Sequence, residues 1–165
     1  MNDHTAPPSK NELVKVRLPL KPGEWKGLEA ENVWAEVVRP GEYRVVNVPF
    51  FFYGLSAEDI VSAEMLDGVL KFTGIVSRGS HSTYRLLLLG GGTIQTPNFA
   101  GYWKPIEELG CTYELATSKW LAVDVPSQAD IYRVYALLED GERNGVWSFD
   151  EGHCGHPVSK RDGQN

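Results

Sequence analysis

Apolar and polar residues alternate through much of the first 80 residues, with the period of two that is typical of half-buried β-strands. In residues 13–20, for example, Val14, Val16 and Leu18 alternate with basic residues. Further strands of this kind are predicted at residues 33–38, 43–48, 61–66 and 69–76. A Pro-Gly pair and an Asp-Gly pair lie in the short turns between them, so we expect two hairpins within a small, curved sheet or barrel.

Beyond residue 80 the spacing of apolar residues changes between a period of two and one of 3.6. Four apolar residues between Ile131 and Leu138 recur at i, i+3, i+4 and i+7, which predicts an amphipathic helix. An earlier helix is expected at residues 97–109, and Pro105 should kink or split it. Strands are predicted around these helices at residues 83–89, 111–116, 120–125 and 146–149.

The order of these elements predicts an α+β protein in two parts. An N-terminal small β-sheet or barrel module is followed by a βαββαβ order, which is that of a ferredoxin-like unit. Both ends of the chain are polar and are expected to be flexible tails. The predicted division is a tail at 1–11, the β module at 12–80, the ferredoxin-like unit at 81–152 and a C-terminal tail at 153–165.

Composition narrows the class of protein. With 165 residues, of which 42% are hydrophobic, the chain suits one compact domain or two small domains that share an interface. Its longest apolar runs are far shorter than the roughly 20 residues of a membrane-spanning helix, and the first ten residues are polar. Cys111 and Cys154 are too few for a disulfide framework. A cytoplasmic protein with reduced cysteines and no membrane contact is therefore expected.

The net charge of −6 is unevenly distributed along the chain. Residues 105–156 hold ten acidic and three basic side chains, whereas residues 1–104 are neutral. Phosphate binding requires clustered Lys and Arg, so the acidic half argues against a nucleic-acid partner. A basic protein partner is expected, and an acidic surface that only maintains solubility is the alternative.

Strand alternation assigns four residues of the predicted ferredoxin-like unit to one face of its sheet. These residues are Glu114, Trp120, Asp124 and Asp150. If this face is open, it is the predicted surface for the basic partner. If the face instead packs on the N-terminal β module, Asp124 or Glu114 is expected to pair with Arg85. A metal or catalytic carboxylate site is a third interpretation.

Two aromatic or histidine-containing segments have competing interpretations as well. The aromatic run at residues 50–53 is expected to plug the β module, with an exposed docking patch as the alternative.

His81 lies among hydroxyl residues and could act as a general base, together with Arg85. Alternation turns His81 away from Ser82, and no nucleophile elbow is present. No catalytic residue is therefore predicted, and these two remain the candidates if the protein is an enzyme.

The segment that contains His153, Cys154 and His156 carries two types of zinc ligand. A structural zinc site usually has two paired ligand motifs at set spacings, and this sequence has one tight cluster. The prediction is therefore that the protein has no cofactor, with zinc held by these three residues as the alternative.

Five short strings are similar to a known signature. They are Trp34-Ala35-Glu36, Asn47-Val48-Pro49-Phe50-Phe51, His81-Ser82-Thr83-Tyr84-Arg85, Gly110-Cys111-Thr112-Tyr113-Glu114 and Ala122-Val123-Asp124-Val125-Pro126. The chain resembles, over residues 12–156, an uncharacterised bacterial family known as a domain of unknown function, frequent in actinobacteria and myxobacteria. The family has no established activity, so the resemblance implies no catalytic residue.

These observations together predict a non-enzymatic cytoplasmic protein-binding module, such as an inhibitor, immunity factor or adaptor. Its acidic C-terminal half would engage a basic protein. In topology and acidity it also resembles small ferredoxin-like protein inhibitors of ribonucleases, a likeness that does not fix function. The alternative is a small enzyme or metal-binding protein that uses the histidine sites above. The sequence leaves the oligomeric state open.

Overall fold

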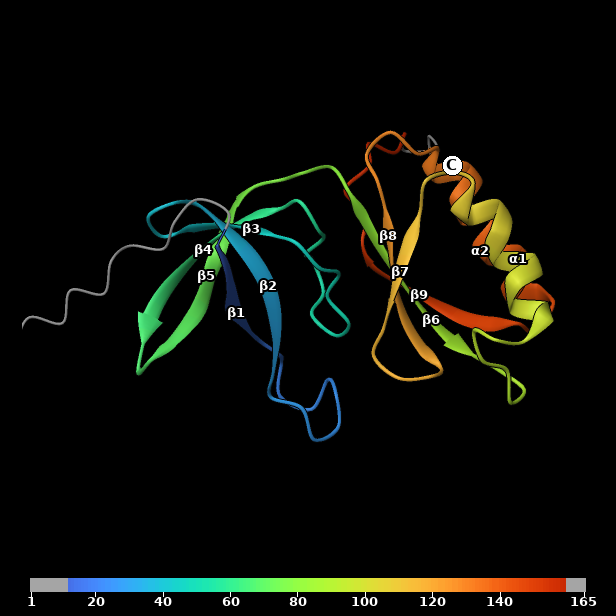
Figure 1. Cartoon of the computed structure of the whole chain (residues 1–165), viewed down its shortest axis with the longest axis horizontal. Coiled ribbons are helices and arrows are strands. Elements are labelled where there is room, and N and C mark those ends of the chain that lie inside the picture. Colours follow the sequence, from blue (N-terminus) through green and yellow to red (C-terminus); the bar gives the residue numbers. More distant parts are fainter. Residues whose placement is uncertain (1–11, 160–165) are drawn as a thin grey trace, which may run out of the picture.

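The computed structural model describes residues 12–159 and contains two β-sheets and two helices (Figure 1). The first sheet is built entirely from the first half of the chain, and the second sheet carries both helices. The expected mixture of strands and helices is thus confirmed. The predicted N-terminal tail, and residues 160–165 of the predicted C-terminal tail, lie outside the described residues.

The first sheet is a closed barrel of five strands in sequential order. Neighbouring strands are antiparallel, and a parallel contact between the first and the fifth, at Arg17 and Lys71, closes the barrel. Its strands are β1 (Leu13–Pro19), β2 (Ala30–Arg39), β3 (Glu42–Val45), β4 (Ile60–Leu66) and β5 (Val69–Ser77). Alternate residues such as Val16, Leu18 and Val33 are fully buried inside it, as the period of two predicted.

The hairpin between β4 and β5 follows from its turn residues. Asp67 and Gly68 have φ angles of 52° and 76°, and two positive φ values are characteristic of the type I′ turn. Gly and Asp adopt this conformation at lower cost than other residues do, so the Asp-Gly pair fixes the register of the hairpin.

The second sheet has the strand order β7-β8-β6-β9, with antiparallel pairing throughout. Its strands are β6 (Ser82–Leu88), β7 (Thr112–Leu115), β8 (Trp120–Val125) and β9 (Trp147–His153). Helix α1 (Pro97–Glu107) continues through Pro105, so this proline does not split it. Helix α2 (Ile131–Arg143) begins where the Asp130 side chain accepts two backbone N–H groups. No helix within residues 12–159 has the length and apolarity to cross a membrane.

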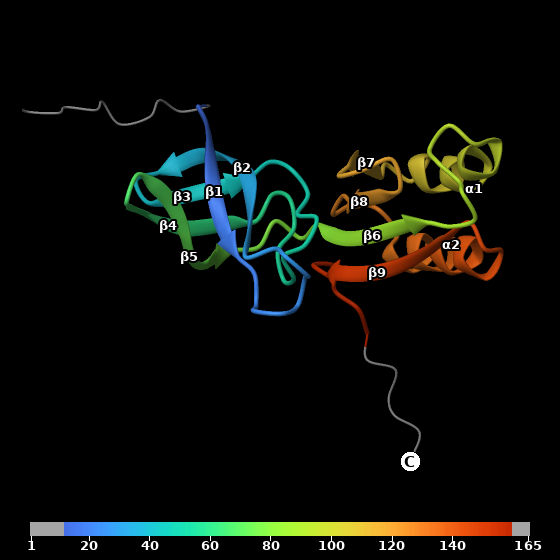
Figure 2. The same ribbon diagram turned by 90° about the horizontal axis from the view of Figure 1, so that it is seen from below.

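Both helices cover the face of the second sheet that points away from the barrel (Figures 1 and 2). Side chains from α1, α2 and the sheet form a second hydrophobic core that includes Phe99, Ile106 and Trp147. In β6, five consecutive residues from Ser82 to Leu86 are buried. Since neighbouring residues point to opposite faces, both faces of β6 must be covered.

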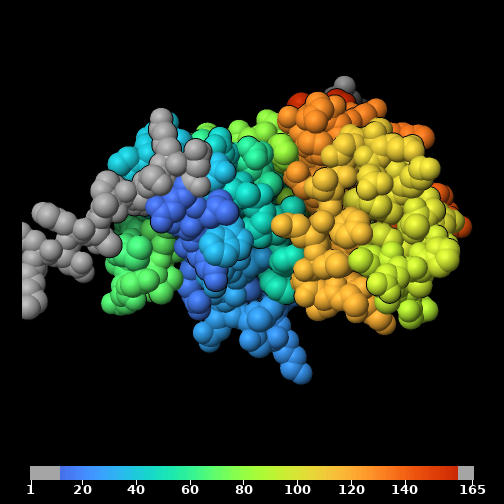
Figure 3. Space-filling model, viewed as in Figure 1, coloured from blue at the N-terminus to red at the C-terminus, as the bar shows by residue number. Residues whose placement is uncertain are grey.

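The helices cover one face of β6, and the N-terminal half of the chain covers the other. The segment at residues 46–59, here called the β3–β4 loop, lies between the barrel and the sheet and hydrogen-bonds to both, as detailed below. In the space-filling view the two halves meet over a continuous contact (Figure 3). Of the interpretations given for the acidic sheet face, the structure therefore shows packing against the N-terminal half.

The start of the predicted C-terminal tail does not agree with the end of β9. Residue 153 was predicted to begin that tail, but His153 is the last residue of β9 and His156 is buried. The barrel strands fall within residues 12–80, and the strands of the second sheet lie between residues 82 and 153.

Candidate functional site

The four residues predicted to bind a partner lie on the barrel-facing side of the second sheet, and each has a contact within the chain. Glu114 accepts a hydrogen bond from the backbone N–H of Val48, at 2.6 Å. Burial raises the pKa of Glu114, and the charge of Asp124 raises it further, against the opposing effect of this hydrogen bond. Glu114 therefore holds the β3–β4 loop against the sheet.

Trp120 packs into an aromatic cluster between the two halves of the molecule. Its ring lies 5.8 Å from that of Trp25 in an edge-to-face arrangement and stacks on Phe51 at 6.5 Å. Phe52, the next residue, packs edge-to-face on Phe72 of the barrel at 5.3 Å. The aromatic run is thus divided between the barrel core and the contact with the sheet.

Arg85 is fully buried beneath the β3–β4 loop. Its Nη2 donates to the carbonyl oxygen of Phe52, and its Cζ lies 4.5 Å from the centre of the Tyr53 ring. Its Nη1 lies 3.9 Å from the Asp150 carboxylate, which also accepts a hydrogen bond from the Tyr53 hydroxyl. Burial lowers the pKa of Arg85. Arg85, one of the two candidates for an enzyme, is therefore enclosed between the loop and the sheet.

The carboxylate of Glu31 was not singled out from the sequence, yet it organises the same loop. It accepts hydrogen bonds from the backbone N–H groups of Phe50, Phe51 and Phe52, and only 8% of the residue is exposed. A glutamate on an alternating strand resembles any other exposed polar residue. Glu31 is nevertheless in phase with the buried Val33 and Ala35 on β2, so alternation alone would have placed it on the inward face. The predicted strand began at residue 33 and left it out.

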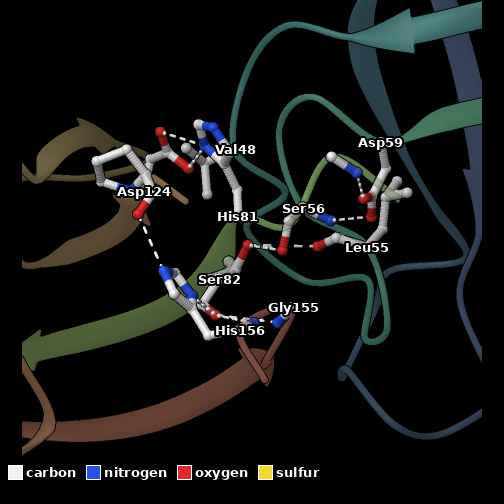
Figure 4. A network of polar contacts seen from close by, with 12 residues as sticks. Val48, Leu55, Ser56, Asp59, His81, Ser82, Asp124, Gly155 and His156 are labelled. Carbon is white, nitrogen blue, oxygen red and sulfur yellow. Dashed lines mark hydrogen bonds and ion pairs between the residues drawn. The ribbon is translucent and has the colours of Figure 1, made fainter. Parts of the chain in front are cut away.

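His81 and Asp124 form a close pair at the edge of this contact (Figure 4). The Nδ1 atom of His81 lies 2.9 and 3.1 Å from the two carboxylate oxygens of Asp124. A carboxylate only accepts hydrogen bonds, so Nδ1–H is the donor. Each side chain is 17% exposed. In the neutral ring this leaves the other nitrogen, Nε2, as a proton acceptor.

Ser82 and His156 form a separate buried pair (Figure 4). His156 Nε2 donates to the carbonyl oxygen of Pro126 at 3.0 Å, so its Nδ1 accepts the Ser82 hydroxyl at 2.6 Å. The Ser82 oxygen also accepts the backbone N–H of Gly155. Ser82 is fully buried. This pair attaches the segment after β9 to β6 and leaves neither histidine nitrogen free.

The three candidate metal ligands do not converge. His156 uses both ring nitrogens as described, and the Cys154 thiol lies 3.7 Å from the carbonyl oxygen of His156. Burial lowers the pKa of His153, and the charge of Arg78 lowers it further. Within residues 12–159 no group of three or more histidine, cysteine or acidic side chains is placed to hold a metal ion.

The other side of the second sheet carries an open groove, here called the α2–β9 groove, with a volume of about 660 Å³. It lies along α2, β9 and the segment that follows β9. Its lining residues are Tyr84, Ile131, Tyr132, Tyr135, Ala136, Glu139, Glu151, Cys154, Val158 and Ser159. Three tyrosines and two glutamates thus line it, and none of these residues is a lysine or arginine.

Hydrogen bonds and ring contacts fix the tyrosines of this groove. The Tyr84 hydroxyl donates to Glu151 at 2.9 Å, and the Tyr84 and Tyr135 rings meet at 6.1 Å with an interplanar angle of 67°. Burial, then the charge of Glu151, raises the pKa of Tyr84, so its hydroxyl stays protonated. Tyr132 and Tyr135 are 57% and 41% exposed. Part of each ring is therefore free to contact a ligand.

Comparison with known proteins identifies the family. The model of a family described as a domain of unknown function, DUF4265, matches residues 31–149. The chain belongs to this family. The match runs from β2 to β9 and thus includes most of the contact between the two halves. It confirms the resemblance to an uncharacterised family that the sequence suggested.

A solved structure, titled as a novel crystal structure of a hypothetical protein from Neisseria gonorrhoeae, is similar to this DUF4265 chain. The two superpose with a TM-score of 0.74 and 19% sequence identity, covering 90% of this chain and 98% of the other. At this identity the likeness shows a shared fold alone. No curated protein matches the chain.

Proposed function

We propose that this DUF4265 protein is a non-enzymatic protein-binding module that engages a basic partner through the α2–β9 groove. The observation that carries the proposal is a groove lined by three tyrosines and two glutamates without a lysine or arginine. Residues 130–151, which supply most of this surface, contain six acidic and two basic residues. Tyrosine is enriched at the centres of protein interfaces, and acidity favours a basic partner.

We propose the α2–β9 groove as the binding surface instead of the acidic sheet face that the sequence predicted. Glu114 and Trp120 contact the β3–β4 loop, so a partner would have to displace the loop to reach them. The carboxylate of Asp124 is already paired with His81. The α2–β9 groove is acidic like the covered sheet face, but it is open to solvent. An inhibitor, immunity factor or adaptor would each use such a surface.

We also propose that the C-terminal half has a ferredoxin-like fold and that the protein is cytoplasmic. The strand order β7-β8-β6-β9, with a helix after β6 and after β8, supports a ferredoxin-like unit at residues 81–152 that follows a barrel at 12–80. Cys111 and Cys154 are both free, which supports a reducing, cytoplasmic environment. A protein with this role needs no cofactor.

Affinity capture from the source cells, followed by direct titration, tests the proposal. A captured protein is purified and titrated calorimetrically at low and moderate salt. We expect direct binding that weakens with salt, because screening reduces attraction between charged surfaces. The double variant Glu139→Gln/Glu151→Gln should weaken binding by roughly tenfold or more.

The matched control is Glu24→Gln/Glu64→Gln, which removes two exposed carboxylates from the barrel half. It should bind like the unaltered protein, since both charges are distant in the fold from the groove. Equal weakening by the two double variants, or binding that salt does not affect, would contradict the proposal.

One observation favours a second function, that of a small enzyme. Asp124 orients His81 so that Nε2 can accept a proton, which is the arrangement of a general base. Arg85, the other candidate, is fully buried and cannot reach a substrate in this conformation. Hydrolysis of a simple activated ester that is lost in both His81→Gln and Asp124→Asn would support this function. Hydrolysis by both variants at the rate of the unaltered protein would exclude it.

A further inference from the structure

A tyrosine hydroxyl donates to a carboxylate at two places on β9. On the barrel side Tyr53 donates to Asp150, and on the groove side Tyr84 donates to Glu151 at 2.9 Å. Neighbouring residues of a strand point to opposite faces, so residues 150 and 151 carry the same arrangement to two separate surfaces. In both, the hydroxyl fixes the carboxylate and leaves its remaining lone pairs available.

An arginine completes the arrangement on the barrel side. The Arg85 guanidinium lies 4.5 Å from the centre of the Tyr53 ring and 3.9 Å from the Asp150 carboxylate. A guanidinium is planar and less strongly hydrated than an ammonium group, so it stacks on aromatic rings and tolerates burial better. The protein therefore already contains one example of the ligand that a tyrosine and a carboxylate accommodate together.

The arrangement on the groove side lacks a cation among residues 12–159. Neither Glu151 nor Glu139 has a basic group within 4.0 Å in that part of the chain. Exposed ring surface of Tyr132 and Tyr135 lies beside these carboxylates. A groove of about 660 Å³ has room for a long side chain.

We propose that the α2–β9 groove binds an arginine side chain of the partner protein. Its guanidinium contacts the tyrosine rings and the Glu151 carboxylate, as Arg85 contacts Tyr53 and Asp150 on the other face. The inference rests on the proposed function and adds to it the chemical class of the ligand. Lysine is disfavoured because its ammonium group loses more hydration on entering a groove lined by rings.

A defined probe tests the inference without the natural partner. A blocked tripeptide with a central arginine is titrated into isotopically labelled protein and followed by nuclear magnetic resonance. Identical peptides with citrulline or lysine at the centre are the controls, and citrulline keeps the shape of arginine without its charge. We expect shifts at Tyr132, Tyr135 and Glu151 with arginine, and affinity lower by roughly tenfold with citrulline.

Two protein variants test the same contacts. Glu151→Gln keeps an acceptor for the Tyr84 hydroxyl and removes the charge, while Tyr135→Ala removes a ring. Each should lower the affinity for the arginine peptide by roughly fivefold or more, and Glu64→Gln should leave it unchanged. Unfolding curves of each variant confirm that it is folded.

Equal binding of arginine and citrulline peptides, equal binding of arginine and lysine peptides, or shifts that map elsewhere would each overturn the inference. A captured partner that depends on Glu139 and Glu151, with no arginine-peptide binding, would overturn the inference alone and leave the proposed function standing. Arginine-peptide binding with no dependence of the partner on these glutamates would contradict the proposed function instead.

Discussion

At the scale of residues, carboxylates replace the backbone partners that an irregular loop lacks. Glu31 accepts three N–H groups of the β3–β4 loop, Glu114 accepts that of Val48, and Asp59 accepts those of Ser56 and Gly79. A buried N–H without an acceptor is costly, so each carboxylate contributes to holding this loop in one conformation. The contact between Ser56 and Asp59 is local, at three residues apart. The other contacts do not follow from the local sequence, because donor and acceptor are far apart along the chain.

Replacement of Glu31 by alanine should therefore lower the free energy of unfolding by at least about 2 kcal/mol, since three donors lose their acceptor. Glu29→Ala is the matched control, because Glu29 is exposed and its loss should change stability by less than about 0.5 kcal/mol. Denaturant unfolding at neutral pH measures both. Equal stability of the two variants would show that the Glu31 contacts carry no net stabilisation.

His153 makes stability depend on pH in a defined direction. Burial lowers its pKa below the ordinary value of 6.5, so the unfolded chain takes up a proton more readily than the folded protein does. Stability should therefore fall as the pH drops below about 6.5. In His153→Gln this contribution should disappear, and the unfolding midpoint should change less between pH 7 and about pH 5. If the unfolding midpoint of His153→Gln changed with pH as much as that of the unaltered protein, the assignment to His153 would be contradicted.

At the scale of elements, alternation and turn residues predicted most strands, whereas contacts between elements were beyond the sequence. The Asp-Gly turn and the strands around it lie where the pattern placed them, because a local conformation determines them. Residues 43–48 were predicted as one strand, but β3 ends at Val45. The loop that follows is held by Glu31 and Glu114 from other elements, which overrides the local preference.

Close packing between α2 and β9 gives a prediction about two glycines. A Cβ at Gly141 in α2 would overlap the indole ring of Trp147, whereas a Cβ at Gly101 in α1 would meet nothing within 4 Å. Alanine favours a helix over glycine by up to about 1 kcal/mol. Gly101→Ala should therefore raise the free energy of unfolding by roughly 0.5–1 kcal/mol.

Gly141→Ala should instead lower it by more than about 1 kcal/mol, because overlap with a buried ring outweighs the gain in helix propensity. Thermal unfolding of the two variants side by side measures the difference. A gain in stability for both would show that Trp147 moves aside at little cost.

At the scale of the whole molecule, the acidity of the C-terminal half was visible in the sequence, but the surface that displays it was not. Alternation grouped Glu114, Trp120 and Asp124 on one face, and that grouping is correct. Whether that face was open depended on the barrel packing against it, which no local pattern encodes. Tyr135 is one of the four residues whose spacing predicts the amphipathic helix, yet its ring is partly exposed and lines the groove.

The most direct test of the account is hydrogen exchange of the whole protein with and without an oligo-arginine peptide. Slower exchange is expected in α2 and in the segment from Glu151 to Ser159, which line the groove. Residues of β7 and β8 that face the barrel should be unaffected, because the β3–β4 loop already covers them. Protection confined to β7 and β8, or no protection in α2, would contradict the claim that the α2–β9 groove is the binding site.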